Sequence, residues 1–164
     1  MPQFFRVFGR NDIQPPPTAL LEEVRRLCPD AQTHFRGDDL GWFAAELVVD
    51  PDEPPLRLDR YLTKEDDIRA DLNTWAAWLE SAGESPIHLR LMQHVISTTQ
   101  LFTLHQPVED HEDNSEADSK IDNLCAHLCR FLASSTDGVY QADHQGFFSA
   151  DGVRLVSEEE APLA

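Results

Sequence analysis

Two histidines flank a short acidic stretch that has the residue types of a metal site. His105 and His111 stand on either side of Asp110, and Glu112 follows directly. Imidazole nitrogen and carboxylate oxygen are ligands that zinc and other first-row divalent ions accept. The spacing fits no established ligand pattern, and acidic loops are commonly only solvated. The four residues are therefore a candidate metal site, with a solvated surface loop as the competing interpretation.

Cys125 and Cys129 lie one helical turn apart, with His127 between them. The trio has the residue types of a soft-metal site, but at about 100° per residue the histidine points away from the cysteine face. Buried cysteine packs as a small hydrophobe, so the sequence favours two core residues over two ligands. With Cys28 the cysteine count is odd, which indicates reduced thiols and no disulfide framework.

Glu46 stands in the otherwise apolar strand expected at 41–49. An unpaired buried carboxylate is costly and shifts its pKa. The sequence therefore predicts an arginine partner, with Arg60 and Arg69 as candidates, or a position that faces a cleft. Trp78 lies at the edge of an apolar helical stripe, where an exposed indole would indicate a contact surface. Glu46 and Trp78 are the candidate binding-surface residues.

The composition restricts the classes of partner. The chain has 30 acidic and 13 basic residues, which gives a formal net charge of −17. Such a charge argues against nucleic acid and anionic membranes, because both are bound through Lys and Arg. It would attract a basic protein at long range, although solubility alone is a sufficient reason for it. None of the common nucleotide, hydrolase or metalloprotease motifs occurs, so no catalytic residue and no cofactor is predicted.

The elements that would position these residues predict an α+β fold. Hydrophobic periodicity and turn signals indicate alternating strands and helices. The expected strands are 3–8, 31–36, 41–49, 56–62, 99–105, 139–142, 146–149 and 153–156, and the expected helices are 18–28, 64–82, 86–97 and 115–133. We expect an antiparallel or mixed sheet packed by helices, in one domain over 1–156. Three consecutive glutamates predict a disordered acidic tail over 157–164.

The two ends of the chain share a pattern. One constant shift lays Gly41 on Gly146 and keeps the preceding helical stripe in register with its counterpart. The pattern predicts a duplicated β-α-β-β unit, with copies at 1–50 and 99–156 and a helical insertion at 63–97. The competing interpretation is coincidence, because such units and glycine-aromatic hairpins are common.

Two stretches carry a resemblance to other proteins. The aromatic helix segment Leu72–Glu80 and the hairpin region Gly138–Gly152 resemble small bacterial α+β proteins to which no activity is assigned. Similar aromatic hairpins occur in small acidic immunity-type and partner-binding proteins. The resemblance implies no functional residue.

The sequence thus favours an acidic protein-binding or interaction module with a basic partner. The alternative is a metal-binding protein or metal-dependent enzyme that uses the loop of His105 and His111. Self-association into a homo-oligomer through an edge strand or Trp78 is a further expectation. The start of the chain lacks the features of a signal peptide, and no apolar run of membrane-spanning length occurs. The expected compartment is therefore the cytoplasm.

Overall fold

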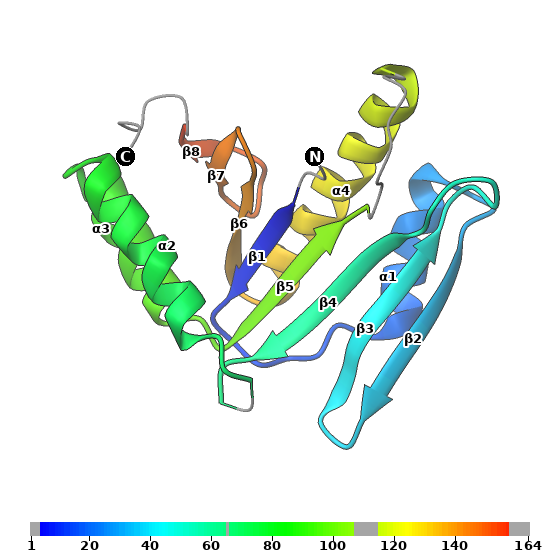
Figure 1. Ribbon diagram of the computed structural model, residues 1–164, viewed down its shortest axis with the longest axis horizontal. Coiled ribbons are helices and arrows are strands. Elements are labelled where there is room, and N and C mark those ends of the chain that lie inside the picture. Colours follow the sequence, from blue (N-terminus) through cyan, green and yellow to red (C-terminus); the bar gives the residue numbers. More distant parts are fainter. Residues whose placement is uncertain (1–3, 65, 107–114, 158–164) are drawn as a thin grey trace.

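An antiparallel sheet of eight strands runs through the described residues, which are 4–64, 66–106 and 115–157 of this computed structural model. The strands are β1 (Phe5–Gly9), β2 (Gln32–Asp38), β3 (Gly41–Val48), β4 (Leu56–Leu62), β5 (Gln100–His105), β6 (Gly138–Ala142), β7 (Gly146–Phe148) and β8 (Arg154–Val156). They lie in the order β2-β3-β4-β5-β1-β6-β7-β8, and every neighbouring pair is antiparallel (Figure 1). The predicted α+β class is confirmed.

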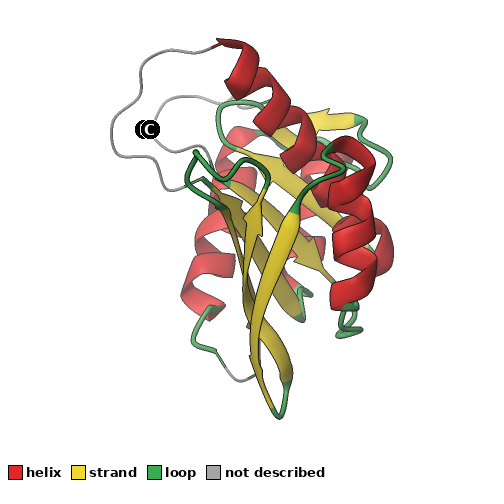
Figure 2. Cartoon of the chain, turned by 90° about the vertical axis from the view of Figure 1, so that its right-hand side faces the viewer, coloured by secondary structure: helices red, strands yellow, loops and turns green. Residues whose placement is uncertain are grey.

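Two pairs of helices cover opposite faces of the sheet. Helices α1 (Pro17–Leu27) and α4 (Ser115–Ser135) lie behind the strands in Figure 1, and α2 (Arg69–Ala82) and α3 (Pro86–Ile96) stand together on the other side. The side view in Figure 2 shows helices on both sides of the strands. The α1–α4 pair covers the middle of its face, whereas α2 and α3 cover one end of theirs.

Alternation along the central strands divides the core into two parts. Phe5, Val7 and Phe102 pack toward α1 and α4, while Phe8 and Leu101 pack toward α2 and α3. Successive strand residues point to opposite faces, so apolar side chains on both faces require cover on both sides. Burying one such side chain stabilises the fold by about 1.5–3 kcal/mol.

The cysteines belong to the first core, which is the part between the sheet and helices α1 and α4. Cys28, Cys125 and Cys129 are buried among its apolar side chains, as the helical spacing of the last two predicts. Burial raises the pKa of the Cys125 and Cys129 thiols, so both stay protonated and unreactive. His127 points elsewhere: its Nε2 lies 2.7 Å from Oε2 of Glu23, which joins α4 to α1.

One expected helix boundary is wrong. Helix α2 begins at Arg69 and not at residue 64, because the two polar side chains that could cap an earlier start, Thr63 and Asp66, bond elsewhere. Oδ2 of Asp66 accepts from the Leu62 backbone N–H at 2.8 Å, and Oγ1 of Thr63 donates to the Thr98 carbonyl at 2.8 Å. At the other end, Ser157 is buried with 7% exposure and 158–164 lie outside the described residues, so the disordered tail predicted over 157–164 stays a prediction.

The two glycine-led hairpins share local geometry but not position. Gly41 and Gly146 both have positive φ, +108° and +120°, which favours glycine at each turn. However, β2 is an edge strand, whereas β6 pairs with β1 in the interior of the sheet. The predicted duplication over 1–50 and 99–156 therefore stays a prediction. Among the described helices, none combines the length and apolar composition needed to cross a bilayer.

His94 attaches the second helical layer, formed by α2 and α3, to the sheet in a pH-dependent way. Its Nε2 donates to the Phe8 carbonyl at 2.8 Å, which ties α3 to β1. Burial lowers the pKa of His94 below its ordinary 6.5; the Phe8 carbonyl opposes this shift, Arg10 adds to it and Asp137 opposes it. The native state therefore holds the neutral ring, whereas the unfolded chain takes up a proton near its ordinary pKa.

We therefore expect stability to be full above about pH 6.5 and to fall as the pH drops below it, by about 1.4 kcal/mol for each pKa unit between the two states. Urea unfolding at several pH values between 8 and 5 measures this. His94→Gln keeps a donor for the Phe8 carbonyl and has no charge to gain, so its free energy of unfolding should fall less over the same range. His105 contributes to both proteins equally. An equal fall in the two proteins would contradict the assignment.

Candidate functional site

The helices leave much of one sheet face open. On this face the strand register sets His34 of β2 opposite Glu46 of β3, Glu46 opposite Arg57 of β4, and Arg57 opposite His105 of β5. The first three side chains are exposed and His105 is half-buried. No helix among the described residues packs against this row, and its polar side chains suit that exposure. The open face therefore begins at the edge strand and ends where α2 meets the sheet.

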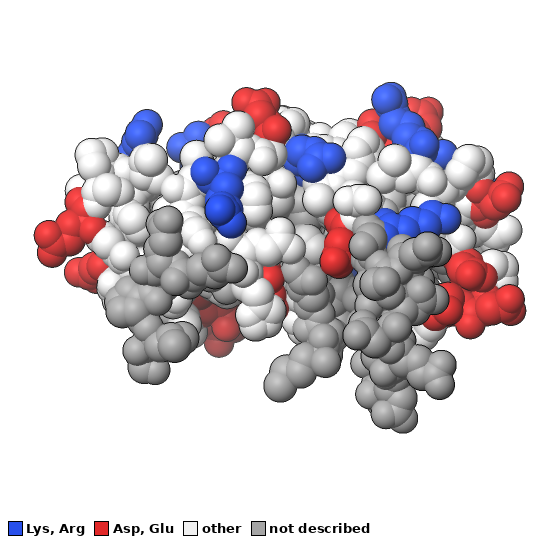
Figure 3. Space-filling model, turned by 90° about the horizontal axis from the view of Figure 1, so that it is seen from above, with Lys and Arg blue, Asp and Glu red and all other residues white. Residues whose placement is uncertain are grey.

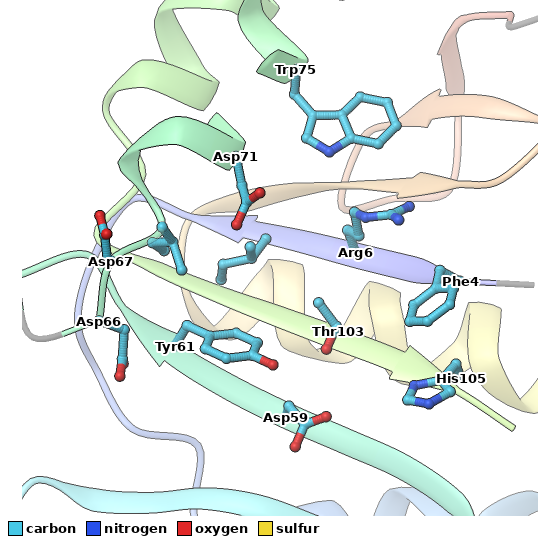
Figure 4. A pocket seen from close by; sticks show the side chains of 12 residues that line it. Phe4, Arg6, Asp59, Tyr61, Asp66, Asp67, Asp71, Trp75, Thr103 and His105 are labelled. Carbon is cyan, nitrogen blue, oxygen red and sulfur yellow. The ribbon is translucent and has the colours of Figure 1, made fainter. Parts of the chain in front are cut away.

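A cavity of about 590 Å³ lies at that boundary (Figure 4). The start of α2 and the segment before it form one wall, and β4, β5 and β1 form the floor. It is lined by Phe4, Arg6, Asp59, Tyr61, Asp66, Asp67, Ile68, Asp71, Trp75, Leu101, Thr103 and His105. The lining combines four carboxylates with four aromatic rings. A smaller hollow of about 440 Å³ over β3 and β4 shares Asp59, Tyr61 and Asp66 with it, so the two meet along β4.

Arg6 is fixed at one end of the cavity. Its Nη1 donates to Oδ1 of Asp143 at 2.7 Å and to Oε1 of Gln141 at 2.8 Å. Its guanidinium carbon lies 5.0 Å from the ring centroid of Trp75 and 5.3 Å from that of Phe4, which is cation–π geometry. Burial raises the pKa of Asp143, but the hydrogen bonds from Gln141 and Arg6 outweigh it, and the net shift is downward. The carboxylate of Asp143 is therefore kept charged at neutral pH.

The aspartates differ in how far the protein satisfies them. Nε of Arg57 donates to Asp59 at 3.3 Å, and Asp66 accepts a backbone N–H. Asp67 and Asp71 are exposed and form no hydrogen bond or ion pair with the residues that the structure describes. Carboxylates beside a helix N-terminus are stabilised by the helix dipole. This explains why Asp67 and Asp71 can stand at the start of α2 without a partner among the described residues. Their hydrogen-bonding capacity remains available to a ligand.

Tyr61 and Thr103 supply the hydroxyl groups of the floor. Burial raises the pKa of Tyr61, the charge of Asp59 adds to the rise, and a hydrogen bond with Thr103 opposes it. The phenol is therefore neutral at physiological pH. With one face of its ring lining the cavity, Tyr61 offers an aromatic surface next to the carboxylate of Asp59 (Figure 4).

His105 is the described member of the predicted metal site. Its ring stacks on Phe4 at a centroid distance of 4.4 Å, and its Nδ1 is buried without a hydrogen-bond partner in the described part of the chain. Burial lowers the pKa of His105, Asp59 opposes the shift and Arg57 adds to it, so the ring is neutral at pH 7. His111, Asp110 and Glu112 lie outside the described residues. Within residues 4–64, 66–106 and 115–157, no three metal-ligating side chains gather, and the metal site stays a prediction.

The two arginines expected as partners of Glu46, Arg60 and Arg69, are wrong. Glu46 is exposed, whereas Arg60 is buried and donates to Oε1 of Gln100 at 2.8 Å. Nη1 of Arg69 donates to the Ile96 carbonyl at 3.0 Å. Glu46 instead stands opposite Arg57 on the open face, at some distance along the strands from the cavity floor.

Trp78 is half-buried and packs inside the second layer. Its ring stacks on Phe147 at 5.9 Å and meets Trp75 edge-on at 6.1 Å. The apolar stripe of α2 therefore accounts for most of its surface. Its proposed part in a contact surface remains a prediction.

Sequence patterns indicate some of the cavity residues that the sequence analysis does not name. On β4, Asp59 and Tyr61 alternate with the buried Leu58 and Arg60, and Arg6 interrupts the apolar strand β1. Polar residues at alternate positions mark one face of a strand. They do not show that β4, β5 and β1 are neighbours, and that order brings the residues together.

Comparison with known proteins adds no relative. No protein-family model matches the chain, and neither the curated proteins nor the solved structures searched contain a match. The resemblance carried by Leu72–Glu80 and Gly138–Gly152 therefore gains no support, and function must be argued from the geometry.

Proposed function

We propose that the protein is a binding protein that receives a basic protein partner on the open face of its sheet. The observation that carries the proposal is the 590 Å³ cavity, in which Asp59, Asp66, Asp67 and Asp71 stand beside aromatic rings. Aromatic surface with carboxylates suits a cationic side chain with an apolar stem. The adjoining hollow extends the surface along β4.

The overall charge supports the same partner. A formal net charge of −17 attracts a basic protein from a distance and raises its rate of association. Seen from the end of the molecule, the basic side chains lie singly and do not form one patch, with acidic side chains at both sides (Figure 3). The described surface in this view therefore shows no large continuous basic patch that would repel such a partner (Figure 3).

Binding to defined polymers tests the proposal. The full chain is immobilised and exposed to poly-L-arginine and poly-L-lysine of matched length, with poly-L-glutamate as the control. We expect the basic polymers to bind and the acidic one not to bind, with affinity falling as salt rises because exposed charges are screened. Absence of binding to both basic polymers at low salt would overturn the proposal.

His105 supports the alternative of a metal-binding protein. Its neutral ring is the form that ligates metal, and its buried Nδ1 has no partner among the described residues. We expect that, if this alternative holds, zinc raises the melting temperature of the purified chain and elemental analysis finds it bound in stoichiometric amount. His105→Ala and His111→Ala should each abolish the shift, while His34→Ala should keep it. No bound metal and no shift with zinc, manganese or nickel would remove the alternative.

A further inference from the structure

We infer that the 590 Å³ cavity takes the guanidinium group of a single arginine side chain presented by the partner. The inference rests on the proposed function, because it assumes a basic protein on the open face. It adds which side chain the partner inserts, where that side chain lies and which residues select it.

The shape and lining of the cavity fit an inserted side chain. The cavity lies where the open face meets the second helical layer, so a segment that crosses β4 can reach it from the adjoining hollow. Ile68 and Leu101 supply apolar surface for the aliphatic stem, and Ile68 itself is buried at the base of the wall. A long side chain that covers apolar surface with its stem and keeps its charge at the tip suits such a lining.

Two aspartates of the cavity are acceptors that the described residues leave unused. Asp67 and Asp71 bond to no described residue, whereas both carboxylate oxygens of Asp59 receive a long contact from Nε of Arg57, at 3.4 and 3.3 Å. Figure 4 shows Asp71 on α2, and Asp59 and Tyr61 on β4, which forms part of the floor. A planar guanidinium has five N–H donors and can bond to carboxylates on two sides while it stacks on a ring.

Arg6 shows the same chemistry inside the protein. Its guanidinium lies between the rings of Phe4 and Trp75 and pairs with Asp143. Because Arg6 already occupies that end, its positive charge repels a second cation there. The incoming group is therefore directed away from Arg6, toward the end of the cavity where Asp66 and Asp67 lie (Figure 4).

Lysine fits this end less well than arginine. An ammonium group is compact and strongly hydrated, whereas a guanidinium is planar, more weakly hydrated and able to make bidentate contacts. Carboxylates that come both from β4 and from the start of α2 favour a group with donors on several edges. We therefore expect selection of arginine over lysine, beyond what net charge provides.

Calorimetric titration with hexa-arginine and hexa-lysine peptides tests the inference. The variant Asp67→Asn/Asp71→Asn removes the unused acceptors, and Glu22→Gln/Glu80→Gln removes the same charge from exposed helical positions outside the cavity. We expect the wild type to bind hexa-arginine several-fold more tightly than hexa-lysine. The cavity variant should lose about tenfold in affinity for hexa-arginine and most of this preference, and the control variant less than about threefold. Melting temperatures check that both variants fold.

Each outcome separates the inference from the proposed function. Equal losses in the two double variants would overturn the cavity as the site while binding of a basic partner stands. Equal affinity for the two peptides in the wild type would overturn selection of arginine. If the wild type binds neither peptide nor the basic polymers, the proposed function fails and the inference fails with it.

Discussion

Gly146→Ala is expected to destabilise the protein by about 3 kcal/mol or more, through backbone strain and a backbone clash together. Gly146 has φ +120°, a conformation that residues with a Cβ rarely adopt. The added Cβ would also meet the carbonyl oxygen of Val156, which is backbone and has no rotamer to change. Relief would require β8 to move away from β7, and that movement would expose Phe147 and Val156 of the second core.

Gly41→Ala is the matched control, since Gly41 opens the other hairpin with φ +108°. There the new Cβ would meet Oε1 of Gln14, the end of a flexible side chain that can turn away. Turning away gives up the hydrogen bond from the Trp42 N–H to Gln14, 3.0 Å long. We expect a loss of about 1–2 kcal/mol, from strain and one hydrogen bond.

Urea unfolding of both variants gives the comparison. A loss at Gly41 as large as that at Gly146 would contradict the distinction between a rigid and a flexible obstacle. Equal losses would instead indicate that the strained φ angle alone accounts for the destabilisation of both variants. The comparison also concerns the predicted duplication. Gly41 and Gly146 are equivalent in the sequence pattern, but a side chain packs against the first and a backbone carbonyl against the second.

Local chemistry explains which elements could be predicted from the sequence. β4 has the predicted bounds, because Leu56 and Leu58 alternate with polar residues between proline-rich and helical signals. Helix α3 begins at Pro86 as predicted, and the side chain of Ser85 caps it by accepting from the His88 N–H. Both patterns involve neighbours in the chain. The start of α2 was missed because Thr63 bonds across the fold to Thr98, and no local pattern shows that contact.

The candidate site was harder to predict than the fold. Arg6, Asp59 and Thr103 meet only because β1 lies between β5 and β6 and β5 lies beside β4. Strand order is set by long-range packing and by the connections that the helices allow, so spacing in one sequence does not reveal it. The histidine pattern at 105–112 indicates His105, which does line the cavity. The metal binding that this pattern predicts, however, also needs residues outside the described ranges.

Arg60→Ala is expected to cost about 3 kcal/mol, whereas Glu46→Gln should change stability by less than about 0.5 kcal/mol. Arg60 is 5% exposed, and its Nε and Nη1 donate to Gln100 Oε1 at 2.8 Å and to the Trp42 carbonyl at 3.1 Å. Burial lowers the pKa of Arg60, and the charges of Asp12, Asp38 and Asp66 oppose the shift. Removal leaves buried acceptors without donors and the Trp42 ring without its cation.

Two further variants separate the packing of Arg60 from its hydrogen bonds and test whether Glu46 is the ion-pair partner of Arg60. Arg60→Met keeps an apolar stem of similar length, so its loss should be smaller than that of Arg60→Ala and should report mainly the unsatisfied acceptors. Combining Arg60→Met with Glu46→Gln should give additive losses, within about 0.5 kcal/mol, because the two side chains share no contact. If Glu46 were the partner of Arg60, the glutamate variant would be costly in the wild type and neutral beside methionine. That pattern would restore the ion pair that the sequence suggests, whereas additivity assigns Arg60 to Gln100 and the backbone of β3.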